Sequence, residues 1–238
     1  MLSPTGASAP PLKYYLNHNL RCLLPLFALN NELIFPPVAL AEPDGLLAIG
    51  GDLSQERLLL AYHNGIFPWY EGQHILWWSP DPRCVLFPEE LKESKSMQQL
   101  IRKGTFTFTI NKAFPEVIAN CKTISRRGQD GTWITDEVKE AYTRLHEAGY
   151  AHSAEAWLDG ELVGGLYGIR LGSVYFGESM FSKASNASKY AFIRYVRQLQ
   201  SEGVELVDCQ VYTEHLASMG ARMIAREEFI TFIHTLGA

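Results

Sequence analysis

Apolar residues make up 47% of the 238 residues and charged residues 20%, which excludes a disordered chain. No apolar run reaches the ~18 residues of a transmembrane helix, so no membrane partner is expected. The four cysteines and seven histidines show no metal-binding spacing, and the net charge of −5 points away from nucleic acid. A protein of a reducing, cytoplasmic compartment without a metal is the simplest interpretation.

The first third of the chain shows little regular structure. Residues 1–33 predict an irregular leader, because they contain four prolines and no sustained hydrophobic period. Residues 34–82 are aromatic and loop-rich and form the expected small N-terminal domain. One helix stands out in it, with Asp52 as the expected N-cap and Gly65 as its end. The Ser-Pro-Asp-Pro segment at 79–82 predicts a hinge to a second domain, 83–238.

Regular elements fill the second domain. We predict helices over 96–103, 113–120, 135–149, 187–201, 214–219 and 226–236, and strands over 106–110, 152–158, 162–170, 173–180 and 204–212. An antiparallel meander followed by a helix, a strand and a helix is typical of acetyltransferase-like domains. The expected fold is therefore α+β, an acetyltransferase-like (GNAT-like) C-terminal domain with a small mixed α/β N-terminal domain.

Basic residues are concentrated in one stretch. Residues 83–127 hold nine Lys and Arg against four Glu, a balance of +5, so the remainder carries −10. A local basic surface can bind a polyanion on an acidic protein, although solvated helix and loop faces are the plainer interpretation. The candidates for phosphate contacts are Lys92, Lys95, Arg102, Lys103, Arg126 and Arg127.

Two predicted strands carry polar residues near their ends. Asp208 and Gln210 share one face of their strand, and a carboxylate beside an amide can orient an amine and relay its proton. Glu178 stands between apolar neighbours, where it is costly unless paired, and it could bind an ammonium group. A polar strand end and a solvated glutamate are the plainer alternatives.

Tryptophans are frequent in the predicted loops. Trp69 follows a Gly-Ile-Phe-Pro stretch, and Trp133 precedes a helix that Thr135 can cap. Stacking on a nucleobase of a single-stranded end is one hypothesis for these rings. Packing between the two domains is the alternative.

These segments together resemble the leucyl/phenylalanyl-tRNA–protein transferases from about residue 34 to the C-terminus. The matching stretches are GLLAIGGDL (45–53), GIFPW (65–69), WWSPDPR (77–83), GTWIT (131–135), GGLYG (164–168), GESMFS (177–182), NASK (186–189) and DCQ (208–210). They occur in the order that the family has. The leader lies outside the resemblance.

The resemblance implies a cytoplasmic enzyme that needs no cofactor, and we expect a monomer. It implies transfer of Leu or Phe, less readily Met, from aminoacyl-tRNA to the N-terminal Arg or Lys of acceptor proteins, which marks them for N-degron degradation. The positions that match the family's aminoacyl pocket are Leu166, Tyr175, Glu178, Met180, Tyr195 and Val207. Trp69 and Trp133 match the contacts to the tRNA 3′ adenosine.

The implied chemistry is the aminolysis of an ester, in which alignment and exclusion of water matter most. Asp208 and Gln210 are the expected catalytic residues, with Asp208 polarising the Gln210 amide that holds the amine. Tyr175 faces away from Glu178 and Met180 in a regular strand. The three can share a pocket only if the strand bulges near Gly177.

Two other functions remain open at this point. A coenzyme-A-dependent N-acetyltransferase uses the same fold, but residues 181–186 lack the glycine turn that holds the pyrophosphate. A non-catalytic RNA-binding module is the third hypothesis, and it would not need Glu178 or Asp208 beside a pocket.

Overall fold

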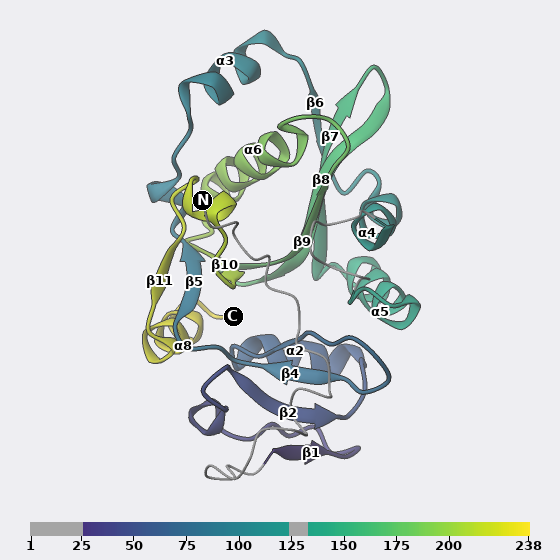
Figure 1. Cartoon of the computed structure of the whole chain (residues 1–238), viewed down its shortest axis with the longest axis vertical. Helices are drawn as coiled ribbons and strands as arrows, with labels where there is room; N and C mark the ends of the chain where they lie inside the picture. Colours follow the sequence, from purple (N-terminus) through teal and green to yellow (C-terminus); the bar gives the residue numbers. More distant parts are fainter. Residues whose placement is uncertain (1–25, 124–132) are drawn as a thin grey trace, which may run out of the picture.

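The structure, a computed structural model, describes residues 26–123 and 133–238 (Figure 1). The leader up to residue 25 and two of the predicted phosphate contacts, Arg126 and Arg127, lie outside the described residues. In the part that is described, no helix is both long and apolar enough to cross a bilayer.

The described residues form two β-sheets, which lie one above the other in Figure 1. The four-stranded sheet has the order β1 (Phe27–Leu29), β2 (Leu46–Gly50), β4 (Leu76–Trp78) and β3 (Phe67–Pro68). The seven-stranded sheet has the order β11 (Arg222–Ile224), β5 (Arg83–Leu86), β10 (Leu206–Gln210), β9 (Val174–Ser182), β8 (Glu161–Leu171), β7 (Ala151–Leu158) and β6 (Thr107–Ile110). The chain changes sheets between β4 and β5, at the segment predicted to be a hinge.

The helices of the larger sheet lie close to their predicted positions. They are α3 (Lys95–Lys103), α4 (Phe114–Thr123), α5 (Asp136–Glu147), α6 (Ala187–Ser201), α7 (Glu214–Ala217) and α8 (Arg226–Thr235). Figure 1 shows α6 on one face of the sheet and α4 and α5 on the other. The meander β7–β8–β9, the helix α6 and the parallel strand β10 follow in the predicted order. The predicted acetyltransferase-like α+β fold is confirmed.

The N-terminal part contains more regular structure than the sequence predicted. Phe27–Leu29, within the predicted irregular leader, pair in parallel with β2. The strands β2, β3 and β4 were missed because they are short and separated by proline- and glycine-rich turns. Two 3-10 helices, η1 (Val38–Leu40) and η2 (Pro88–Glu90), and the short strands β5 and β11 were also not predicted.

The helix α2 (Gln55–His63) begins later than the sequence predicted. Its N-cap is Ser54, whose hydroxyl oxygen accepts from the backbone N–H of Arg57 at 3.4 Å. Asp52, the predicted cap, instead accepts from the backbone N–H of Ser54 at 2.8 Å and pairs with the Arg57 side chain. Both residue types suit the position, and the turn before the helix decides between them.

The predicted bulge in β9 is present. Tyr167 pairs with Ser179 and Gly168 pairs with Gly177, so Glu178 is the extra residue on β9. Gly168 makes this possible because a Cβ there would lie 2.1 Å from the Phe176 carbonyl oxygen. A second register shift follows on the neighbouring strand β10, where Gln210 has the left-handed φ of 62°. The two irregularities lie on adjacent strands and re-aim their side chains.

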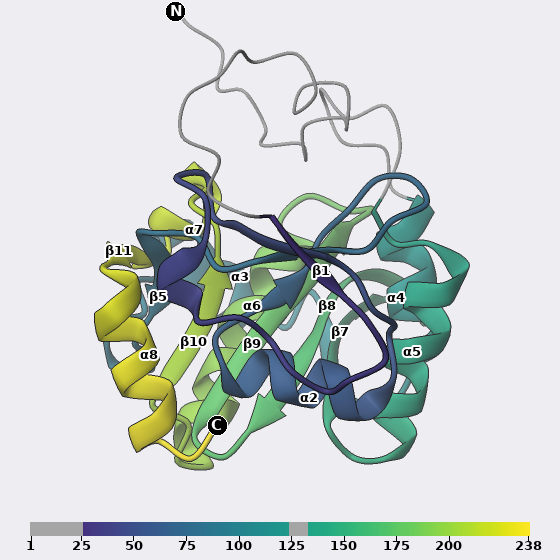
Figure 2. The ribbon, with the colours of Figure 1, turned by 90° about the horizontal axis from the view of Figure 1, so that it is seen from below.

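The helix α2 connects the smaller sheet to the larger one. Figure 2, seen from below, shows α2 crossing in front of β9 and β8. The two elements are in contact, since the ring centroids of Tyr62 on α2 and Phe176 on β9 lie 5.2 Å apart. The hydroxyl of Tyr62 also bonds that of Tyr142 on α5. This junction positions the site described next.

Candidate active site

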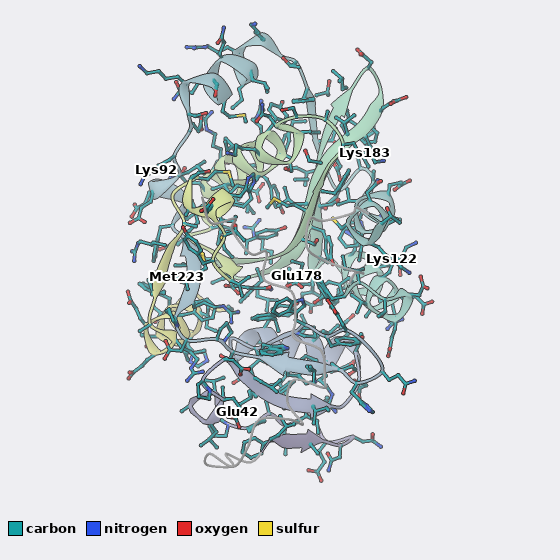
Figure 3. All side chains as sticks on the ribbon, in the orientation of Figure 1. Glu42, Lys92, Lys122, Glu178, Lys183 and Met223 are labelled. Carbon is teal, nitrogen blue, oxygen red and sulfur yellow. The ribbon has the colours of Figure 1, made fainter. Side chains whose placement is uncertain are left out.

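A cavity of about 360 Å³ lies at the junction of the two sheets. The β3 residues Phe67 and Pro68, followed by Trp69, form one side of its wall. β8, β9, α6 and the segment from β10 into α7 form the rest. Figure 3 places Glu178 near the centre of this junction, between the sheets. The wall is mostly apolar, with a few polar groups, as expected of a site for a small apolar group.

The structure brings most of the predicted site residues to this wall. Those that line the cavity are Trp69, Trp133, Leu166, Glu178, Met180, Val207, Asp208 and Gln210. They come from segments up to 141 residues apart in the sequence, the separation between Trp69 and Gln210. The predicted bulge contributes directly, because the extra residue Glu178 is itself part of the wall.

Tyr175 and Tyr195 do not line the cavity. Their side chains are 1% and 3% exposed, and their rings form a T-shaped pair with centroids 5.1 Å apart. Both belong to the same apolar cluster as Leu166. Tyr175 and Met180 lie on either side of the bulge and belong to the same apolar cluster, so the bulge brings both to the face that α6 covers. Tyr175 is nevertheless buried within that cluster and does not reach the cavity.

Phe192, His215 and Leu216 line the cavity but were not predicted. Phe192 lies one turn before Tyr195 on α6, so the apolar face of that helix was the available signal. His215 and Leu216 belong to the four-residue helix α7. Nothing in the local pattern of so short a helix indicates a cavity.

The carboxylate of Glu178 is held by three donors. The Tyr62 hydroxyl donates to Oε1 at 2.8 Å, the Tyr142 hydroxyl to Oε2 at 3.0 Å, and Gln210 Nε2 to Oε1 at 2.8 Å. Burial raises the pKa of Glu178 to about 7, and the hydrogen bonds from Tyr62 and Tyr142 oppose that rise. The residue itself keeps some exposure to the cavity. The Glu178 carboxylate, which lines the cavity, can therefore gain or lose its charge near neutral pH.

The carboxylate of Asp208 binds Arg83 and not the Gln210 amide, which was the expected partner. Its Oδ1 accepts from Arg83 Nε at 2.8 Å and its Oδ2 from Arg83 Nη2 at 2.7 Å. Both side chains are almost fully buried, and the guanidinium lies between the rings of Phe67 and Phe229. Asp208 meets Gln210 only through its backbone N–H, at 2.9 Å. The group that contacts the Gln210 amide is Glu178, not Asp208.

Gln210 is presented to the cavity by the irregular end of β10. Its left-handed backbone and the hydrogen bond from its N–H to Asp208 fix the residue, and Glu178 fixes its amide nitrogen. Its amide oxygen accepts no hydrogen bond from the described residues. That oxygen is suited to accept one from a bound amine.

The four described candidates for phosphate contacts, Lys92, Lys95, Arg102 and Lys103, are all exposed. None of them lines the cavity. Figure 1 places α3 at the end of the molecule opposite to β1. The backbone N–H of Lys92 donates to the carbonyl of Met219 at 2.9 Å, which ties the start of this basic segment to the end of α7.

The described residues contain no group of three or more His, Cys, Asp or Glu side chains that could hold a metal ion. The polar groups of the cavity instead bind one another. Such an arrangement can orient an amine and a carbonyl against each other, and the apolar wall can hold a hydrocarbon side chain.

Among solved structures, two of the likenesses are distant. The structure of L-PGS from Bacillus licheniformis superposes with a TM-score of 0.38 at 13% identity, covering 72% of this chain and 57% of that one. A GCN5-related N-acetyltransferase from Kribbella flavida gives a TM-score of 0.37 at 11% identity, with 70% and 60% covered. Likenesses at this level carry no assignment of chemistry.

The sequence comparisons are far closer. A protein from Syntrophobacter fumaroxidans named leucyl/phenylalanyl-tRNA–protein transferase is 57% identical over 88% of this chain and 90% of its own length. One of the same name from Chromobacterium violaceum is 56% identical over 85% and 88%. The model of the leucyl/phenylalanyl-tRNA protein transferase family matches residues 85–234, and that of its N-terminal domain matches residues 51–81. The chain is a transferase and belongs to the leucyl/phenylalanyl-tRNA–protein transferase family.

Proposed function

We propose that the protein transfers Leu or Phe, and less readily Met, from aminoacyl-tRNA to the N-terminal Arg or Lys of acceptor proteins. The modified proteins are thereby marked for degradation in the cytoplasm, and the enzyme acts as a monomer. The observation that carries the proposal is the apolar cavity with the Glu178–Gln210 pair in its wall. The names of the close relatives support a leucyl- or phenylalanyl-tRNA donor and a protein acceptor.

In the proposed reaction, the acceptor's α-amine attacks the ester carbonyl of the aminoacyl-tRNA. A C–N bond forms, the bond from the carbonyl carbon to the ribose 3′ oxygen breaks, and one proton passes from the amine to that oxygen. An α-amine has a pKa of about 7.7–8.0, so part of it is neutral at physiological pH. Alignment and exclusion of water then supply much of the rate.

Different side chains of the cavity bind the aminoacyl group, the tRNA 3′ adenosine and the acceptor amine. Leu166, Met180, Val207 and Phe192 provide the apolar slot for the aminoacyl side chain. Tyr175 and Tyr195 pack in the same apolar cluster as Leu166 and hold its shape. We assign Trp69 and Trp133, which also line the cavity, to the tRNA 3′ adenosine. Gln210 positions the amine, and Asp208 fixes Gln210 through its backbone.

We propose a small N-terminal domain up to residue 82 and a catalytic domain over 83–238. The leader predicted over 1–33 is shorter than that range, because β1 (Phe27–Leu29) belongs to the sheet of the small domain. Tyr62 comes from the smaller domain and bonds Glu178 of the larger one, so the site is complete only when both are joined.

One assay tests the proposed function. The protein is incubated with labelled Phe-tRNA and a peptide that begins with Arg, beside a matched peptide that begins with Ser. Labelled Arg peptide and unlabelled Ser peptide are expected. Transfer only from acetyl-CoA would establish the N-acetyltransferase hypothesis instead, and retention of tRNA without turnover would establish the RNA-binding module.

The basic segment is expected to hold the tRNA through its phosphates. Replacing Arg102 and Lys103 by Ala should raise the KM for Phe-tRNA and Leu-tRNA equally, because phosphate contacts carry no information about the amino acid. Each lost contact should reduce the slope of log K against log salt by about 0.7–0.9. KM is measured for both tRNAs at two salt concentrations.

The matched control for this experiment removes the same charge elsewhere. Lys139→Ala with Arg144→Ala on α5 should leave the salt slope at its original value. A changed preference between Leu and Phe, or an unchanged slope in the Arg102 and Lys103 variant, would place the tRNA on another face.

A further inference from the structure

The cavity contains a histidine that the reaction described so far does not use. His215, on α7, lines the same cavity as Gln210 and Glu178. No described residue hydrogen-bonds either nitrogen of its ring, and Nε2 is shielded from solvent. Nε2 therefore does not open onto the cavity, and Nδ1, which no described residue contacts and which is not shielded in this way, is the ring nitrogen that can meet a bound substrate.

The other titratable groups of the wall are less suited to receive a proton. Both oxygens of Asp208 are engaged by Arg83, and both oxygens of Glu178 accept from donors. Burial and its contact with Cys84 raise the pKa of the Cys209 thiol well above its usual range. The Gln210 amide is neutral and a poor base. Imidazole is the side chain most often used for proton transfer.

The surroundings of His215 keep its ring neutral. Burial lowers its pKa, and the positive charge of Lys189 on α6 lowers it further. Lys189 donates to the Ser218 hydroxyl at 3.3 Å, which holds it near α7. The charged groups on the other elements are Glu178 of β9, Asp208 of β10, which is paired with Arg83 of β5, and Glu214 of α7 itself. The ring is therefore a free proton acceptor at neutral pH.

We propose that His215 is a catalytic residue that accepts the proton of the attacking amine and delivers it to the leaving ribose oxygen. This step rests on the proposed transfer function. As the C–N bond forms, the amine nitrogen loses one proton to the imidazole. As the carbonyl carbon separates from the 3′ oxygen, the imidazolium returns that proton to it. The ring ends neutral, and no other reactant is needed.

The pH dependence of kcat/KM separates this role from a structural one. At pH values below the lowered pKa of the imidazole, the wild-type rate should fall with a slope that is steeper by one, since the imidazole must then be unprotonated as well as the amine. In His215→Ala the amine and Glu178 still titrate as they do in the wild type, but the imidazole is absent, so the limiting slope on the acidic side should be lower by one. The rate at neutral pH should drop by roughly 10²–10⁴-fold. His234→Ala, which removes an exposed histidine from α8, is the control and should keep the wild-type profile.

Further measurements keep the test decisive. Added imidazole should restore part of the rate of His215→Ala, in proportion to its neutral form, while His234→Ala should not respond. His215→Gln keeps a polar side chain of similar length and should lose as much rate as His215→Ala. If one of the two variants fails to fold, the other can still be measured. If the wild type transfers the amino acid and the His215 variants show the same pH slope as the wild type, the proposed role of His215 is wrong. No transfer by the wild type would instead overturn the proposed function.

Discussion

Leu166→Trp is expected to lower transfer of both Leu and Phe by roughly 10–100-fold, the equivalent of the ~1.5–3 kcal/mol gained by burying such a side chain. Leu166 is 2% exposed and sits opposite Met180 in the β8–β9 ladder. An indole at this position would occupy the slot meant for the aminoacyl side chain. The measurement is kcat/KM for Phe-tRNA and Leu-tRNA at saturating Arg peptide.

The binding of the tRNA itself should survive this change. The residues of α3 that we propose to contact the tRNA phosphates do not line the cavity, so the Kd for deacylated tRNA should stay near its original value. Leu166→Met keeps the volume and is the control, with a cost below ~1.5 kcal/mol in stability and near-normal transfer. Full activity of Leu166→Trp in a folded protein would show that the aminoacyl side chain binds elsewhere.

Asp208→Ala is expected to destabilise the fold by about 3–5 kcal/mol, because it leaves the Arg83 guanidinium buried without its counter-charge. It also removes the acceptor that fixes the Gln210 backbone. The folded fraction should therefore show a kcat that falls more than KM for the peptide rises. Urea unfolding and steady-state kinetics on the same preparation measure the two effects.

A double variant distinguishes stability from catalysis at this position. Arg83→Met with Asp208→Leu removes both charges and should recover most of the lost free energy of unfolding, since apolar replacements of a buried ion pair are often neutral or better. Its kcat should stay low if Asp208 is needed to fix Gln210. Wild-type kinetics in this variant would show that neither member of the pair contributes to turnover.

The two irregular strands explain why this cavity exists. In a regular β9, neighbouring side chains would point to opposite faces of the sheet, so only every second residue could line the cavity. The extra residue Glu178 and the left-handed Gln210 lie on adjacent strands and are joined by a hydrogen bond of 2.8 Å. The tyrosines of α2 and α5 close the arrangement from the other side. Both domains therefore supply hydrogen-bond donors to the carboxylate of Glu178.

The sequence by itself determined much of the fold. Helical periodicity placed α5 and α6, and the alternation of apolar residues placed β7 and β8, because these signals act over a few residues. It also indicated a bulge near Gly177, and that bulge is present, although Tyr175, for whose sake it was predicted, does not line the cavity. The ordered motifs pointed to the family.

The tertiary structure alone decided which polar groups meet. Arg83 and Asp208 are 125 residues apart, and their pairing leaves Glu178 as the partner of the Gln210 amide. It likewise buried Tyr175 and Tyr195 against each other, outside the cavity wall, and brought Phe192 and His215 to that wall. The physical reason is that hydrogen bonds and burial between distant segments depend on strand order and on the packing of helices across a sheet. Neither leaves a signal in the local pattern of residues.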